Sequence, residues 1–136
     1  MTSLDLASAE RIAKAAVAHA RAAGRNPSGI VVIDGSTNVK FALREDGANL
    51  AAIDIATGKA RAALTFGCTS KQIADALSGN ALAGPSVLGV LGGRIVLLGG
   101  AVPIKDASGA IIGAIGVAGG APDDDEAIAS AGAAAL

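Results

Sequence analysis

The stretch GGAVPIKDASGAIIGAIGVAGGAPDDDE, residues 99–126, decides the fold of this chain. Two apolar runs flank the four residues Asp106-Ala107-Ser108-Gly109, a composition that is typical of a hairpin turn. Gly113 and Gly116 interrupt the second run, and glycine inside a strand indicates that another backbone or a ligand comes close. Glycine pairs stand at the outer ends of the two runs. We therefore expect an antiparallel hairpin with a binding rim at its ends.

Outward from this hairpin, apolar periodicity predicts four helices and three further strands. The helix nearest the start has Ser3 as its expected cap and Gly24 just past its end. Residues 78–92 contain Gly and Pro and are expected to form a surface loop. The elements predicted in chain order are a helix at 4–23, strands at 29–34 and 39–43, helices at 50–66 and 70–77, strands at 94–98, 102–105 and 110–117, and a helix at 124–136.

The order α-β-β-α-α-β-β-β-α predicts an α+β fold with a five-stranded antiparallel sheet and flanking helices. With 136 residues, we expect a single domain over 1–136. Its helices are rich in alanine, which buries little area per residue, so we expect self-association into a homo-oligomer.

Composition excludes several classes of function. The net charge of −1 and the presence of only two aromatic residues, both Phe, argue against nucleic acid as a partner. No apolar run reaches the roughly 20 residues that cross a bilayer, so no membrane partner is expected. The Met1 end lacks the pattern of a signal peptide, and Cys68 has no second cysteine to pair with. We therefore expect a cytoplasmic location.

Arg44 and Asp46 lie where a strand ends and are the first candidate binding residues. A guanidinium can hold a carboxylate ligand by two parallel hydrogen bonds. The alternative is that Arg44 pairs with Asp46 or Glu45 and only stabilises the turn. We expect Arg44 and Asp46 to share one cleft with the backbone N–H groups of Gly99, Gly100 and Gly119, because binding groups gather at element ends.

Lys59 is the third candidate, because it lies in an Ala-rich helix where it could be partly desolvated and bind an anion or move a proton. The alternative is a lysine whose stem packs on the helix and whose ammonium group reaches water. His19, the single histidine, could ligate haem iron, although its helical position favours a half-buried structural role.

No metal site is expected, because one His and one Cys cannot complete a zinc site. Cys68 is interpreted as a small apolar residue in the interior, not as a reactive thiol. The acidic run Asp123-Asp124-Asp125-Glu126 is interpreted mainly as a helix cap, with a divalent cation as the alternative.

Six short motifs in this order resemble the GlcG/HbpS-like proteins, also called the haem-degrading domain family, and the similar C-terminal domain of PduO-type proteins. The motifs are Asp34-Gly35, Arg44-Glu45-Asp46-Gly47-Ala48, Ile55-Ala56 with Lys59-Ala60 and Ala63, Gly99-Gly100 with Val102-Pro103-Ile104, Gly113-Ala114-Ile115-Gly116-Val117, and Asp125-Glu126. The resemblance covers almost the whole chain. It implies an antiparallel sheet flanked by helices, assembly into homo-oligomers, and haem as a cofactor or ligand in some members.

Two classes of function are left open. In the first, the chain is a small-molecule binding protein for haem, another tetrapyrrole or an anionic ligand. In the second, it is an enzyme acting on a small hydroxy- or oxo-acid, with Arg44 and Lys59 as anion-binding or acid–base groups. The residues alone favour the first class, because they contain no set of acid, base and nucleophile.

Overall fold

The computed structural model describes residues 3–136 and contains, within them, five helices and four strands. The elements in chain order are α1 (Leu6–Ala22), β1 (Gly29–Asp34), β2 (Val39–Arg44), α2 (Ala52–Phe66), α3 (Ser70–Leu77), α4 (Ala83–Val90), β3 (Ala101–Lys105), β4 (Ile111–Ala118) and α5 (Pro122–Ala133). The α+β class is confirmed. The expected five-stranded sheet is wrong, because the antiparallel sheet has four strands in the order β2-β1-β4-β3.

Residues 94–98, expected to be a strand, form none. Ile95 is buried and packs with Ile73 of α3. A Cβ added to Gly58 of α2 would lie 3.1 Å from the backbone nitrogen of Val96, so this segment runs directly over α2. Ile95 is thus buried against helices without pairing to another strand, Val96 and Leu97 are partly buried, and Leu98 is 51% exposed.

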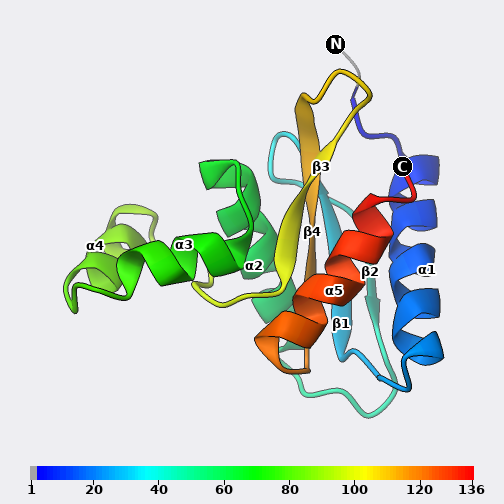
Figure 1. Cartoon of the computed structure of the whole chain (residues 1–136), viewed down its shortest axis with the longest axis horizontal. Helices are drawn as coiled ribbons and strands as arrows, with labels where there is room; N and C mark the ends of the chain where they lie inside the picture. Colours follow the sequence, from blue (N-terminus) through cyan, green and yellow to red (C-terminus); the bar gives the residue numbers. More distant parts are fainter. Residues whose placement is uncertain (1–2) are drawn as a thin grey trace.

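The expected surface loop at 78–92 is also wrong, because it contains α4. Pro85 falls in the first turn of α4, where a missing N–H breaks no helical hydrogen bond. Val87 and Leu88 pack against the small apolar cluster shared by α2 and α3. Tertiary packing therefore outweighs the low helix propensity of the segment. Together α3 and α4 project from the body of the molecule as an arm (Figure 1).

The sheet lies between two helical layers, with α1 and α5 on one face and α2 on the other (Figure 1). Strand β1 explains this arrangement, because its residues 30–33 are fully buried on both faces. Ile30 and Val32 belong to the cluster of α1 and α5, whereas Val31 and Ile33 pack on the alanines of α2. A strand covered on both sides is apolar throughout.

Gly116 of β4 confirms the expectation that a strand glycine marks a close approach. A Cβ at this position would overlap the carbonyl oxygen of Ala56 and lie 3.1 Å from the backbone nitrogen of Ala60, both in α2. The small residues of α2 and β4 therefore allow helix and sheet to pack almost backbone to backbone.

One end of the sheet, hereafter the sheet end, is where β1 and β3 begin and β2 and β4 stop. Strand pairing aligns Gly29 with both Arg44 and Ala118 there, and β3 begins beside β4. Helix α5 follows directly from β4 at this end. Most of the candidate residues identified in the sequence therefore lie at the sheet end. Within residues 3–136, no helix is both long and apolar enough to cross a bilayer.

Candidate functional site

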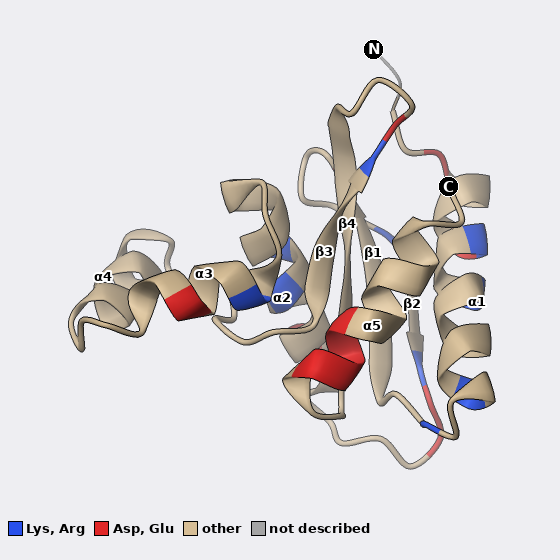
Figure 2. Ribbon diagram, in the orientation of Figure 1, with Lys and Arg blue, Asp and Glu red and all other residues tan. Residues whose placement is uncertain are grey.

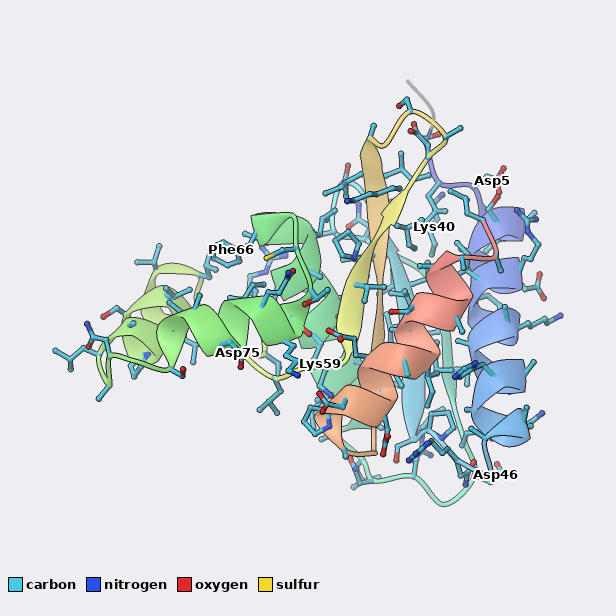
Figure 3. The ribbon with its side chains drawn as sticks, viewed as in Figure 1. Asp5, Lys40, Asp46, Lys59, Phe66 and Asp75 are labelled. Carbon is cyan, nitrogen blue, oxygen red and sulfur yellow. The ribbon has the colours of Figure 1, made fainter. Side chains whose placement is uncertain are left out.

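Lys59 is enclosed in the interior at the sheet end. Its side chain points from α2 toward α5 (Figure 3), and the residue is only 4% exposed. The ammonium group donates to the carbonyl oxygen of Val117 at 3.0 Å and to Oδ2 of Asp125 at 3.3 Å. Lys59 therefore joins α2 to the end of β4 and to α5, and its ammonium group does not reach water.

Asp125, the partner of Lys59, is fully buried in the first turn of α5. Its carboxylate also accepts the backbone N–H of Gly120 at 3.1 Å. Burial raises the pKa of the Asp125 carboxyl above its ordinary value, and the charge of Lys59 opposes this rise. The two charges thus form a buried pair whose polar atoms are satisfied by each other and by the backbone.

Gly100 makes room for this pair. Its φ of 132° lies in a region that favours glycine, and an added Cβ would lie 2.9 Å from Nζ of Lys59 and 3.0 Å from Cβ of Asp125. Gly99 is buried beside Pro122, the first residue of α5. The structure therefore brings Lys59, Gly99 and Gly100 together.

Arg44 is the last residue of β2, so it also lies at the sheet end, and its side chain is exposed. Its Nη1 donates to the carbonyl oxygen of Ala48 at 2.8 Å, and Glu45 pairs instead with Arg21. Arg44 thus stabilises the turn after β2, through a carbonyl and not through an acidic neighbour. Asp46 is exposed in the same turn, well apart from Lys59 (Figure 3).

A groove between α1 and β2, hereafter the α1–β2 groove, has Arg44 in its wall and a volume of about 470 Å³. Lys14 and Arg21 of α1 add two further cations, and Val17 and Leu43 supply apolar surface. Glu45, which pairs with Arg21, also lines the groove, so the groove combines a net positive charge with apolar surface.

Gly119 lines a different cavity, of about 350 Å³, at the start of α5. The ion pair between Arg25 and Asp124 borders this cavity. Arg44 ends β2, and Ala118, the residue before Gly119, ends β4. Strand β1 lies between these two strands in the sheet. The structure thus places Arg44 and Gly119 in separate cavities.

The three aspartates of the acidic run after β4 each pair with a different cation, whereas, within residues 3–136, Oε1 of Glu126 is buried without a hydrogen-bond partner. Asp123 pairs with Lys71 at 3.0 Å, Asp124 with Arg25, and Asp125 with Lys59. These acids gather on the first turn of α5 (Figure 2). The expected capping hydrogen bonds are wrong, because the residue at the N-cap is Ala121 and no side chain caps it.

Sequence reasoning missed the inward role of Asp125. The signal was present, because Asp125 stands three residues before Ile128 and four before Ala129, which are both buried. A carboxylate on that helix face must enter the interior. Within residues 3–136, no group of three or more His, Cys, Asp or Glu side chains is placed to hold a metal ion.

His19 is exposed, so the expected half-buried role is wrong. The buried strip of α1 is centred on Ala13, Ala16 and Ala20, and His19 falls on the flank of that strip. Cys68 is half-buried beside the apolar cluster of the arm.

The protein is thus of the α+β class, with a four-stranded antiparallel sheet between two helical layers and a buried Lys–Asp pair at one end of the sheet. The family model described as haem-degrading protein HbpS-like matches residues 4–134. The chain therefore belongs to the HbpS-like family, and the resemblance inferred from the six motifs is confirmed.

Solved structures agree with this assignment. The crystal structure of HbpS is 34% identical, with a TM-score of 0.86 and coverage of 100% of this chain and 92% of that chain. A complex of PduOC with haem is 26% identical, with a TM-score of 0.86 and coverage of 99% and 96%. Protein ORFY of Klebsiella pneumoniae is 27% identical, with a TM-score of 0.85 and coverage of 100% and 94%. The comparison with curated proteins finds no match.

Proposed function

We propose that this protein binds a small anionic molecule, with haem or another tetrapyrrole as the foremost ligand, and that it does so as a cytoplasmic homo-oligomer. The observation that carries the proposal is the likeness to PduOC, whose crystal structure is a complex with haem and which shares the fold at a TM-score of 0.86. Membership of the HbpS-like family supports the same ligand class.

The α1–β2 groove is the proposed binding site. A tetrapyrrole such as haem presents an apolar ring and acidic groups at its edge, and the groove offers both kinds of partner. Its wall holds Lys14, Arg21 and Arg44, and Val17 and Leu43 lie beside them. Arg44 uses one nitrogen for the Ala48 carbonyl and has further donors for an acidic ligand. These residues fit the acidic edge and the apolar face of a tetrapyrrole, and no usual axial ligand of a haem iron is among the described residues that line the groove.

The other expected site residues take supporting roles in this proposal. Asp46 lies exposed in the turn that follows Arg44, and Gly119, with a φ of 113°, lies where the chain leaves β4 toward α5. Lys59, Gly99 and Gly100 hold the sheet end together with Asp125. The enzymatic alternative needs Lys59 to reach a substrate, but this residue is 4% exposed and bonded to a buried carboxylate. A binding function is therefore preferred.

A haemin titration followed by absorption spectroscopy tests the proposal. We expect a saturating shift of the Soret band for the wild-type protein. Arg44→Gln should weaken binding about tenfold, since a charge-assisted hydrogen bond is lost. Lys40→Gln is the matched control, because it removes one positive charge from the other end of the same strand.

A titration without a saturating shift would overturn the proposed ligand. Equal affinities of the Arg44→Gln and Lys40→Gln variants would remove the groove as its site. His19→Ala gives a separate readout, because His19 is the only histidine of the chain. It follows Ala18 in α1 but does not itself line the groove. A change in the bound spectrum, with affinity kept, would identify an imidazole ligand of the iron.

A further inference from the structure

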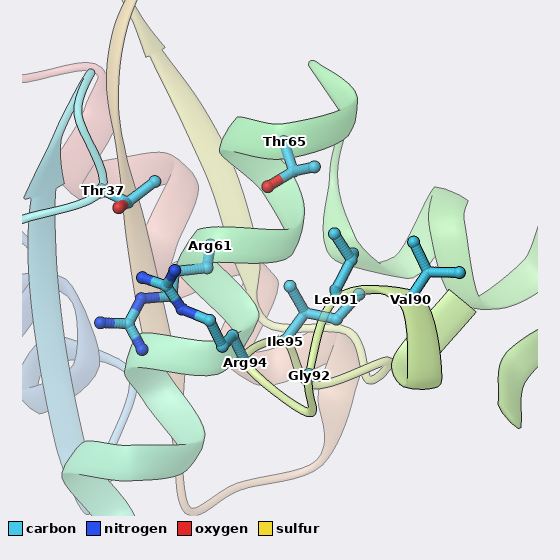
Figure 4. A pocket seen from close by; sticks show the side chains of 8 residues that line it. All are labelled: Thr37, Arg61, Thr65, Val90, Leu91, Gly92, Arg94 and Ile95. Carbon is cyan, nitrogen blue, oxygen red and sulfur yellow. The ribbon is translucent and has the colours of Figure 1, made fainter. Parts of the chain in front are cut away.

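A third cavity, on the α2 side of the sheet, is lined by two arginines (Figure 4). Arg61 projects from α2, and Arg94 comes from the segment between α4 and β3. The two guanidinium groups lie side by side, with Thr37 of the β1–β2 turn close to them (Figure 4). The cavity has a volume of about 420 Å³, and Thr65 adds a second hydroxyl to its lining.

These two arginines differ from the other four in the chain. Within residues 3–136, the other four all donate hydrogen bonds to a carboxylate, a hydroxyl or a carbonyl oxygen, and they are Arg11, Arg21, Arg25 and Arg44. In the same described residues, the side chains of Arg61 and Arg94 form no hydrogen bond or ion pair. The Nε of Arg61 is buried without an acceptor. Buried N–H groups in folded proteins are almost always paired, so this atom indicates a missing partner.

The charge of the cavity points to the same conclusion. Among the residues that the structure describes, no acidic side chain lines the cavity, so two like charges lie next to each other without a counter-charge in its wall. A guanidinium presents a planar set of donors that matches the two oxygens of a carboxylate or a phosphate. Two such groups at one place are suited to a ligand with two negative charges.

An apolar wall limits the ligand further. Val90 at the end of α4 is 86% exposed, and Leu91 follows it in the lining. Figure 4 shows both residues on the side of the cavity away from the guanidinium groups. A ligand that fills the cavity therefore carries its charge at one end and an apolar group at the other.

We propose that this cavity binds a small dianionic molecule with an apolar body, whose acidic head is held by Arg61 and Arg94. The head is a phosphate ester or a pair of neighbouring carboxylates, and Thr37 and Thr65 supply hydroxyl partners. The site is separate from the α1–β2 groove, because α2 covers the opposite face of the sheet. It does not depend on haem as a ligand.

Isothermal titration calorimetry with phenyl phosphate, inorganic phosphate and phthalate tests this site. Phenyl phosphate or phthalate should bind more tightly than inorganic phosphate, because only these two carry an apolar ring. The tighter of the two identifies the head group. Arg61→Gln and Arg94→Gln should each weaken binding at least tenfold, whereas Arg11→Gln, on the exposed side of α1, should leave it unchanged.

Two further measurements separate a binding role from a structural one. Without ligand, Arg61→Gln and Arg94→Gln should melt no lower than the wild type, because each removes an unpaired charge. Arg61→Lys keeps the charge and loses the planar donors, so it should also bind weakly. If the wild type and these variants bound each probe, phenyl phosphate or phthalate, with the same affinity, the proposal would be overturned. The absence of binding of both probes to the wild type would overturn it as well. A haemin titration of the same variants should be unchanged, so the two sites can fail independently.

Discussion

Lys59 and Asp125 are a buried ion pair at the point where α2, α5 and the end of β4 meet. Taking charges out of water is costly, and mutual attraction offsets that cost only while both partners are present. The pair therefore makes the junction of three elements dependent on two side chains. A hydrophobic replacement of one partner leaves the other charged and enclosed.

We expect Lys59→Met to lower the free energy of unfolding by about 3–5 kcal/mol at neutral pH, because Asp125 is left buried and unpaired. The pKa of Asp125 is already raised by burial, so its protonated form is favoured in the folded state. Acidification through that folded pKa should therefore restore part of the lost stability. Urea denaturation at neutral and acidic pH measures both effects.

Lys71→Met is the matched control, because Lys71 pairs with Asp123 on the surface, where an ion pair adds little stability. Similar losses for Lys59→Met and Lys71→Met, or a Lys59→Met loss that grows on acidification, would contradict the role given to the buried pair.

Gly116 leads to a second prediction at the residue scale. Gly116→Ala should lower the free energy of unfolding by about 1–3 kcal/mol, because its methyl group would overlap the α2 backbone at Ala56. Gly79→Ala is the control, since a Cβ there meets no atom within 4 Å. Chemical denaturation of both variants checks the difference, and equal stabilities would argue against close packing of α2 on β4.

At the scale of elements, the β3–β4 hairpin depends on Asp106. Its carboxylate accepts the backbone N–H groups of Ser108 at 2.9 Å and Ala110 at 3.1 Å, as the turn sequence indicated. The side-chain hydrogen bond from Ser108 is the main cause that lowers the pKa of Asp106. A lowered folded pKa means that this carboxylate stabilises the fold above the unfolded value of 3.8 and loses that effect as the pH falls through the folded pKa.

We expect Asp106→Asn to remove part of the acid sensitivity of the protein. The amide oxygen can still accept the turn hydrogen bonds, but it does not titrate with the carboxylate. Melting temperatures between about pH 2 and pH 5 should therefore fall less for Asp106→Asn than for the wild type. Asp106→Ala should melt lower than the wild type at neutral pH, where the Asp106 carboxylate is ionised. Parallel curves for the wild type and Asp106→Asn would show that Asp106 does not contribute to the acid transition.

At the scale of the whole molecule, the arm of α3 and α4 stands away from the sheet and its helical layers (Figure 1). No residue of α4 is fully buried, and Leu82 at its start is 74% exposed. Phe66 at the end of α2 is 47% exposed. Leu82 and Phe66 are thus large apolar side chains exposed to solvent, and contiguous patches of such side chains are typical of an interaction surface.

We therefore expect the protein to assemble into a closed homo-oligomer in which a second copy covers the arm. Light scattering coupled to size-exclusion chromatography should give a mass that is a multiple of 13.0 kDa. Leu82→Ser should shift the distribution toward the monomer. Leu50→Ser, outside the arm, is the control, since it removes a side chain that is 93% exposed. A monomer mass for the wild type at micromolar concentration would contradict assembly.

The sequence by itself determined the features whose causes are local. Helix α3 has the predicted bounds Ser70–Leu77, because Thr69 and Gln72 form a reciprocal cap at its start. The turn at residues 106–109 follows from the hydrogen bonds of Asp106 to its near neighbours. Such signals act over a few residues, so the chain carries them wherever it is placed. The ordered motifs likewise indicate the family without reference to the fold.

Only the tertiary structure decided which residues are enclosed and which distant residues meet. Residues 94–98 have the composition of a strand, but Val96 of this segment lies against Gly58 of α2 and Ile95 is buried among the helices. The pairing of Lys59 with Asp125, and the meeting of Arg61 with Arg94, each join residues far apart in the chain. Burial and long-range pairing depend on how helices and sheet pack, and that packing depends on the shapes of all the elements at once.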